Sequence, residues 1–121
     1  MLEYSKEPAM TEKPKIDMTI YNLQANISKT LANPIRLAIL HVLRDGEKSV
    51  NELTDLLGIS QSNLSQHLAL MRQIGILKTR KQGTSIFYSV TNSKINQACD
   101  MVREVLLDQL RQKQEIASNY P

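Results

Sequence analysis

Two short helical segments joined by a glycine turn, near the middle of the chain, restrict its fold more than any other feature. Ser49 and Glu52 have the spacing of a capping box, so a helix is expected to begin after Ser49. Gly58 supplies a left-handed stop, and Ser60 can cap a second helix two residues later. The expected inward rows are Val50, Leu53, Leu56 and Leu57 in the first helix and Leu64, Leu68 and Met71 in the second. The pattern predicts a helix-turn-helix over about residues 49–74.

The hydrophobic period changes from helical to alternating directly after this motif. Residues 77–81 and 85–90 favour extended structure, because Ile86, Tyr88 and Val90 occupy every second position of the second segment. Gln82 and Gly83 lie between the two segments and mark a turn. We predict a two-stranded hairpin, or wing, over about residues 77–90.

Three further helices are expected on either side of these elements. Apolar residues at helical spacing mark residues 18–31, and Asn33-Pro34 then forms a favourable start for a helix that Asp45-Gly46 ends. The last helix is expected over about residues 92–116. The order is α-α-α-α-β-β-α, so the fold class is mainly α with a small β-hairpin.

The chain of 121 residues is expected to form one domain with two tails. The domain covers residues 18–116, preceded by a flexible tail, 1–17, and followed by a short one, 117–121. No apolar run approaches the length of a membrane-spanning helix, and the first residues carry no secretory or transit signal. A single cysteine excludes an internal disulfide framework, which favours the reducing cytoplasm.

The charge distribution points to a polyanionic partner. The net charge is only +3, but no Asp or Glu occurs between residues 56 and 99. That segment contains five basic residues, Arg72, Lys78, Arg80, Lys81 and Lys94. A basic surface without acids suits nucleic acid, although a solvated face that happens to lack acids would give the same composition.

Two stretches of the sequence resemble the ArsR/SmtB family of winged-helix repressors. One is LANPIRLAILHVL, residues 31–43, and the other is VNELTDLLGISQSNLSQHLALMRQIGILKTRKQGTSIFYSV, residues 50–90. The resemblance implies a winged helix-turn-helix and a homodimer in which the first and last helices of both chains pack together. It also implies repression of an operator that is relieved by a small inducer, such as a metal ion or a redox signal.

The second helix of the motif has the side chains that reading of DNA requires. Short polar groups and amides at the N-terminal half of a recognition helix can reach base edges in the major groove. The candidate DNA-binding residues on this helix are Gln61, Ser62, Asn63, Ser65, Gln66, His67 and Arg72. Glutamine can pair with adenine through two hydrogen bonds, so Gln61 or Gln66 is expected to read a base. In the family the histidine corresponding to His67 lies close to DNA, but a packed histidine is the alternative.

Three basic residues outside this helix are also candidates for DNA contact. Arg80 and Lys81 lie next to the tip of the wing, where phosphate or minor-groove contact is expected. Arg36 matches the family's arginine after the proline, and pairing with Glu52 or Asp55 is the alternative to DNA contact. Phosphate contacts give affinity with little sequence discrimination, so binding should weaken steeply with salt.

Surplus apolar surface on the first and last helices predicts a homodimer. The candidate interface residues are Ile20, Leu23, Ile27, Ile95, Val102, Val105 and Leu106. A two-fold dimer places two recognition helices about one DNA turn apart, so the expected partner is a double-stranded palindromic operator.

The inducer is the least constrained part of the prediction. The family's Cys-x-Cys metal site is missing from residues 50–58, and the last helix lacks the histidine of the family's second metal site, so neither a metal site nor a cofactor is expected. Cys99 is a possible redox residue, with burial as a small apolar side chain as the alternative. An organic inducer, or none, also stays open.

The function predicted from the sequence is a sequence-specific DNA-binding repressor that an unidentified signal releases from its operator. The alternative is a winged-helix module for protein contacts or for DNA binding without sequence preference. No cluster of residues has the spacing of an acid-base, nucleophilic, phosphate-binding or metal site, so the chain is not expected to be an enzyme.

Overall fold

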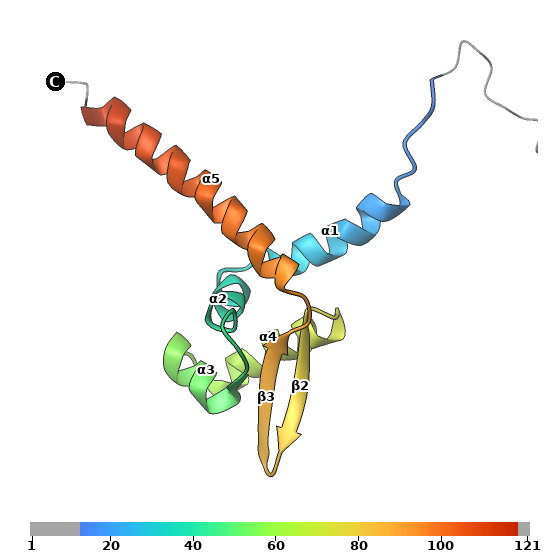
Figure 1. Ribbon diagram of the computed structural model, residues 1–121, viewed down its shortest axis with the longest axis vertical. Helices are drawn as coiled ribbons and strands as arrows, with labels where there is room; N and C mark the ends of the chain where they lie inside the picture. The colour runs from blue at the N-terminus through green and yellow to red at the C-terminus, as the bar shows by residue number, and fades with distance from the viewer. Residues whose placement is uncertain (1–12, 119–121) are drawn as a thin grey trace, which may run out of the picture.

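The computed structural model describes residues 13–118, and the parts of the two expected tails at 1–12 and 119–121 lie outside the described residues. Its helices are α1 (Thr19–Leu31), α2 (Pro34–Val42), α3 (Val50–Leu57), α4 (Gln61–Gln73) and α5 (Ser93–Ser118), and its strands are β1 (Lys48–Ser49), β2 (Leu77–Gln82) and β3 (Ser85–Val90). Figure 1 shows α1 and α5 diverging from α2, with α3, α4 and the hairpin β2–β3 on its other side. This arrangement confirms the predicted order of helices and hairpin strands.

Local capping interactions set the bounds of the helix-turn-helix. The Ser49 side chain accepts a hydrogen bond from the Glu52 N–H at 3.2 Å, and the Glu52 carboxylate accepts one from the Ser49 N–H at 3.1 Å. This is the predicted capping box. Gly58 ends α3 with a left-handed φ of 65°, and its N–H donates to the Thr54 carbonyl at 2.8 Å. The Ser60 hydroxyl then caps α4 by accepting from the Asn63 N–H.

The sheet has one strand more than the sequence predicted. The hairpin is present, with Leu77 opposite Val90 and Gln82 opposite Ser85. A two-residue strand, β1, adds to its free edge, so the strand order is β1-β3-β2. Two residues are too few to show a hydrophobic period, and this strand exists only because β3 offers unpaired backbone groups. The addition ties the segment before α3 to the wing.

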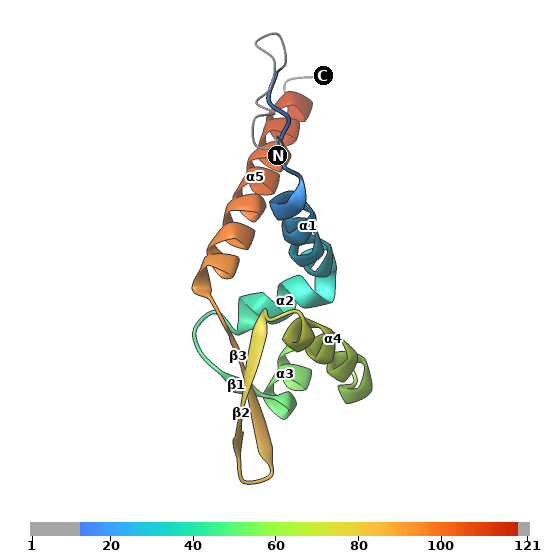
Figure 2. The same ribbon diagram turned by 90° about the vertical axis from the view of Figure 1, so that its right-hand side faces the viewer.

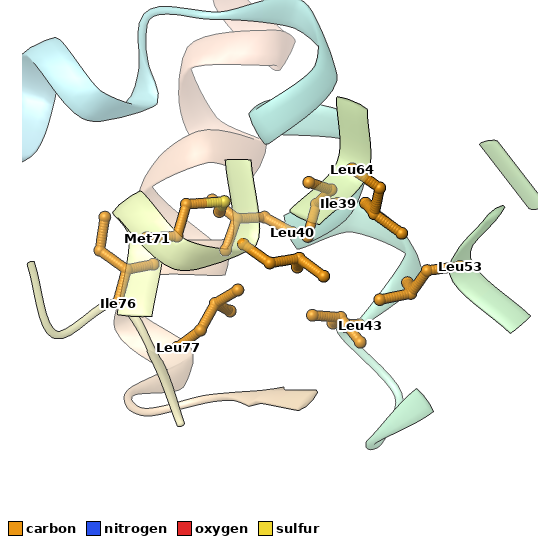
Figure 3. Close-up of a cluster of buried hydrophobic side chains, with 9 residues drawn as sticks. Ile39, Leu40, Leu43, Leu53, Leu64, Met71, Ile76 and Leu77 are labelled. Atoms are coloured by element: carbon orange, nitrogen blue, oxygen red, sulfur yellow. The ribbon is translucent and has the colours of Figure 1, made fainter. Parts of the chain in front are cut away.

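One hydrophobic cluster joins the helix-turn-helix to α2 and to the start of the hairpin (Figure 3). Its buried members are Ile39, Leu40, Leu43, Leu53, Leu64, Leu68, Met71, Ile76 and Leu77. Leu56 was expected among the inward residues of α3 but is 58% exposed, which corrects that prediction. At 100° per residue, Leu56 lies about a quarter turn away from the direction shared by Val50, Leu53 and Leu57.

Polar contacts fasten α5 to this core. The Asn96 side chain donates to the Leu40 carbonyl at 2.8 Å, and Arg44 forms a salt bridge with Asp100 at 2.7 Å. Only the first turns of α5 make these contacts. The helix then continues away from the core to Ser118, two residues beyond its predicted end. Within the described residues, no helix combines the length and apolar character that crossing a bilayer requires.

The different burial of two leucines on α3 predicts different effects on stability. Leu53 is 0% exposed and belongs to the core, so Leu53→Ala should lower the free energy of unfolding by about 2–5 kcal/mol. Leu56→Ala removes the same atoms from an exposed position and should change it by less than about 1 kcal/mol. Urea denaturation followed by circular dichroism measures both values. Equal losses for the two variants would contradict the assigned packing of α3.

Candidate nucleic-acid interface

The face of α4 opposite the core carries a row of short polar side chains. Leu64, Leu68 and Met71 bury the inner face of the helix almost completely, which fixes its rotation about its own axis. The five polar residues predicted in its first half are all exposed: Gln61, Ser62, Asn63, Ser65 and Gln66. Their only side-chain hydrogen bond within the described part of the chain joins the Ser62 and Ser60 hydroxyls at 3.3 Å. The row is therefore free to bind a ligand.

The N-terminus of α4 leaves two backbone donors available. The Ser60 hydroxyl takes the Asn63 N–H at 3.2 Å, and the Leu64 N–H makes the first intrahelical bond, to the Ser60 carbonyl, at 3.0 Å. The cap thus uses the Asn63 N–H within the chain. The amides of Gln61 and Ser62 stay at the positive end of the helix dipole.

His67 differs from the other predicted residues of α4 because it is half-buried and bonded within the chain. Its Nδ1 accepts a hydrogen bond from Arg36 Nε at 3.1 Å. Burial lowers the pKa of His67, and the nearby Arg36 charge lowers it further, so the ring is neutral near pH 7. Arg36 also donates to the Thr30 carbonyl at 3.1 Å. The expected alternative partners of Arg36, Glu52 and Asp55, do not pair with it.

The wing places one of its two predicted cations in an ion pair. Arg80 Nε lies 3.1 Å from both carboxylate oxygens of Glu47, and Arg80 Nη1 donates to the Gln82 side chain at 2.9 Å. The guanidinium also lies over the Phe87 ring, 4.8 Å from its centroid. The hydrogen bond from Arg80 lowers the pKa of Glu47, which stays ionised. A phosphate must therefore compete with Glu47 for Arg80, although solvent weakens an exposed pair of this kind.

The other basic residues of this region have no carboxylate partner among residues 13–118. Lys81, beside the tip of the wing, and Arg72, near the end of α4, are exposed and form none of the described salt bridges. Figure 2 shows α4 and the hairpin together at the end of the molecule opposite the free ends of α1 and α5. The structure thus brings the predicted helix and wing to one side.

Sequence reasoning missed Glu47 and the partners of Arg36, both of which shape this side. It did not find Glu47 because the acid-free segment begins nine residues later, and only the pairing of β1 with β3 carries Glu47 to the wing. It named Arg36 as a candidate for DNA contact or for pairing with Glu52 or Asp55. It did not find His67 as a partner, since contact between α2 and α4 has no local signature in the sequence. The family position of Arg36 was the available signal for a role near α4.

Cys99, the possible redox residue, packs beside the core. It is half-buried and lies against the hydrophobic cluster. Burial raises the pKa of the Cys99 thiol; Arg103 lowers it and Asp100 raises it in smaller measure. A raised pKa reduces the thiolate fraction on which oxidation depends. No group of three or more His, Cys, Asp or Glu side chains in residues 13–118 is arranged to hold a metal ion.

The two arms of the molecule carry exposed apolar side chains. On α1 these are the predicted residues Ile20, Leu23 and Ile27, and on α5 they are Val102, Val105 and Leu106, with exposures of 41–71%. The seventh predicted interface residue, Ile95, instead packs against the core of its own chain. Its position in the first turn of α5 explains the difference, because that turn lies directly over α2.

Comparisons with known proteins relate this sequence to a family of bacterial regulatory proteins. The model of the arsR family of bacterial regulatory proteins matches residues 33–79, which include α2, the helix-turn-helix and the start of the wing. The biofilm growth-associated repressor of Xylella fastidiosa is 40% identical over 91 residues, which cover 75% of this chain and 80% of that protein. The transcriptional activator HlyU of Vibrio cholerae is 40% identical over 77 residues, which cover 64% of this chain and 71% of that protein.

The crystal structure of Rv0081 from Mycobacterium tuberculosis has the same fold. Its TM-score is 0.71 at 35% sequence identity, over 80% of this chain and 98% of that one. The residues that the family model matches contain the helix-turn-helix and the start of the wing, in agreement with the resemblance noted from the sequence. The chain belongs to the ArsR family of bacterial regulatory proteins and is a transcriptional regulator with a winged helix-turn-helix, not an enzyme.

Proposed function

We propose that the chain binds DNA as a homodimer and represses transcription from an imperfect palindromic operator. The observation that carries the proposal is the free polar face of α4: five exposed residues with short polar or amide side chains lie above a fully buried apolar row. This face contributes little to folding, and its chemistry suits base edges in the major groove. Gln61 and Gln66 are assigned to base contacts, and Lys81 and Arg72 to phosphates.

Exposed apolar residues on α1 and α5 support the homodimer. Isolated in water, side chains such as Val102 and Leu23 would leave large apolar areas uncovered, and a second copy of the same arms can cover them. A dimer with a two-fold axis that binds B-DNA needs its two recognition helices about 34 Å apart, one turn of the duplex, and we expect the two α4 helices of the proposed dimer to meet that spacing. A palindromic operator follows from that symmetry.

Repression, and not activation, is the proposed effect of binding. Among the relatives named above, one is a repressor and one an activator, and the repressor aligns with the larger share of this chain. Acting on DNA, the protein would work in the cytoplasm. The releasing signal stays unassigned, and the raised pKa of Cys99 favours a signal other than oxidation of this thiol.

The assignment of α4 predicts a loss of sequence preference. Fluorescence anisotropy compares a duplex from the gene's own upstream region with a scrambled duplex at near-physiological salt. The wild type should prefer the native duplex by about 10³-fold or more. Replacing Gln61, Ser62 and Gln66 together by Ala should remove this preference and leave salt-sensitive binding to both duplexes. Gln73→Ala, at the exposed far end of α4, is the control and should keep it.

If the triple variant retained the wild-type preference, α4 would not be the reading helix. Equal, salt-sensitive binding of both duplexes by the wild type would count against an upstream operator and favour a module that binds DNA without sequence preference.

The proposed dimer interface on α1 and α5 predicts that a charged side chain on α5 weakens dimerisation. Val102 is 71% exposed in the single chain, so Val102→Asp should leave each chain folded while desolvation of the new carboxylate opposes dimerisation. Sedimentation equilibrium should show monomers at concentrations where the wild type is dimeric. Gln97→Asp places the same carboxylate at another exposed position of α5 and serves as the control. A dimer of unchanged affinity in the Val102 variant would exclude this face.

The position of Cys99 predicts that mild oxidation does not release DNA. Because burial raises the pKa of its thiol, brief exposure to dilute hydrogen peroxide should leave operator affinity unchanged. Cys99→Ser should bind with the same affinity before and after the treatment, measured by anisotropy. Release of DNA by the oxidised wild type, with retention by Cys99→Ser, would establish a redox signal and contradict this prediction.

A further inference from the structure

One side chain, Arg36, links α4 to the C-terminal end of α1. It lies in the first turn of α2 and uses two of its nitrogens within the chain. Its Nε donates to His67 Nδ1 of α4 at 3.1 Å, and its Nη1 donates to the Thr30 carbonyl of α1, also at 3.1 Å. Thr30 is buried, with 6% exposure. A single rigid guanidinium thus connects three helices.

The bond to His67 determines where the imidazole carries its hydrogen. A guanidinium has donors only, so Nδ1 must offer its lone pair to Arg36. The ring hydrogen of the neutral imidazole then lies on Nε2. A hydrogen on Nδ1 would place two donors against each other beside a positive charge, which disfavours both the other tautomer and the imidazolium.

The opposite nitrogen of His67 reaches solvent. Among the described residues, no side-chain nitrogen or oxygen is both fully buried and without a hydrogen-bond partner. His67 Nε2 takes part in none of the hydrogen bonds described for residues 13–118, so it is accessible. It belongs to the same helix as the exposed Gln66 and Ser65. An N–H group held in one direction is therefore exposed on α4, one helical turn after the exposed Asn63.

The charge of Arg36 is not used in an ion pair with the described residues. The four salt bridges of residues 13–118 join Arg44, Arg80, Arg103 and Arg111 to carboxylates, and none of them includes Arg36. Partial burial of an arginine without an acidic partner costs free energy unless hydrogen bonds satisfy its N–H groups. The two bonds it makes both orient groups on other helices.

We propose that Arg36 is a positioning residue for DNA recognition, which holds His67 in the Nε2–H form so that His67 presents a directed, neutral donor to an acceptor on the DNA. The inference rests on the proposed function, since the donor lies within the same interface. Through Thr30, the bond also ties the orientation of that donor to the end of α1. His67 then adds a hydrogen bond without adding charge, unlike Lys81.

Nitrogen-15 NMR of the free protein tests the assigned tautomer without DNA. In the wild type near neutral pH, His67 should show an unprotonated Nδ1 and a protonated Nε2. Arg36→Met keeps a long stem but removes the donors, and it should lose this preference while backbone spectra show an intact fold. A wild-type ring with its hydrogen on Nδ1, or with both nitrogens protonated, would overturn the proposal even if the variant failed to fold.

Two substitutions at His67 test the donor in DNA binding. The amide nitrogen of His67→Gln can take the place of Nε2, whereas the oxygen of His67→Asn can accept from Arg36 but supplies no donor at the outer position. We expect His67→Asn to weaken binding by about tenfold and His67→Gln to retain most of the affinity. An equal loss on native and scrambled duplexes identifies a phosphate acceptor, and a loss on the native duplex alone identifies a base edge.

The salt dependence separates a neutral donor from a cation. For both His67 variants, the slope of log affinity against log salt should equal that of the wild type, while Lys81→Ala should reduce it by about one. Wild-type affinity in both His67 variants, or a reduced slope in either, would overturn the inference. Failure of the wild type to prefer any native duplex would instead count against the proposed function, and the NMR result would still judge the tautomer.

Discussion

The burial of one apolar row, Leu64, Leu68 and Met71 of α4, is the contact on which the rest of the structure depends. These side chains belong to the buried cluster that joins α4 to α2, α3 and the start of β2, and Figure 3 shows Leu64 near Ile39 and Met71 near Ile76. Full burial of each contributes about 1.5–3 kcal/mol, far more than any exposed polar contact of the same helix. Rotating α4 to bury its other face would place amides and hydroxyls in the core without partners. The core therefore determines which face of α4 meets the solvent.

Because of this constraint, the two faces of α4 have different roles. The inner face of α4 stabilises the domain, and the outer face is left to chemistry that folding does not need. Acids are absent from the sequence between residues 56 and 99, and Glu47 forms an ion pair with Arg80 of the wing. In the proposed function, exposed cations such as Lys81 would supply attraction to phosphates, and the polar row of α4 would supply sequence discrimination.

Local interactions made much of the fold predictable. The helix caps at Asn33, Ser49 and Ser60 and the left-handed stop at Gly58 involve residues close in sequence, so these helix bounds could be predicted. The hairpin could be predicted for the same reason, because its turn and its alternating strand are also local patterns. The polar residues of the first half of α4 were foreseen as exposed because the helical period assigns their face. Contacts between distant segments were not. The extra strand β1, the pairing of Arg80 with Glu47 and the packing of Ile95 each need a neighbour that the sequence does not name.

By itself, the sequence determined the number and order of the long elements, the exposed polar face of α4, the basic residues of the wing and the family to which the chain belongs. These properties rest on spacing and capping, which act over a few residues. Tertiary structure alone decided which polar groups are free and which are held. It gave Arg36 a histidine and a carbonyl instead of a carboxylate, and it placed Cys99 where burial raises the pKa of its thiol. The reason is physical: hydrogen bonds, charges and desolvation depend on distance in space, and three-dimensional packing sets that distance for residues far apart in the chain.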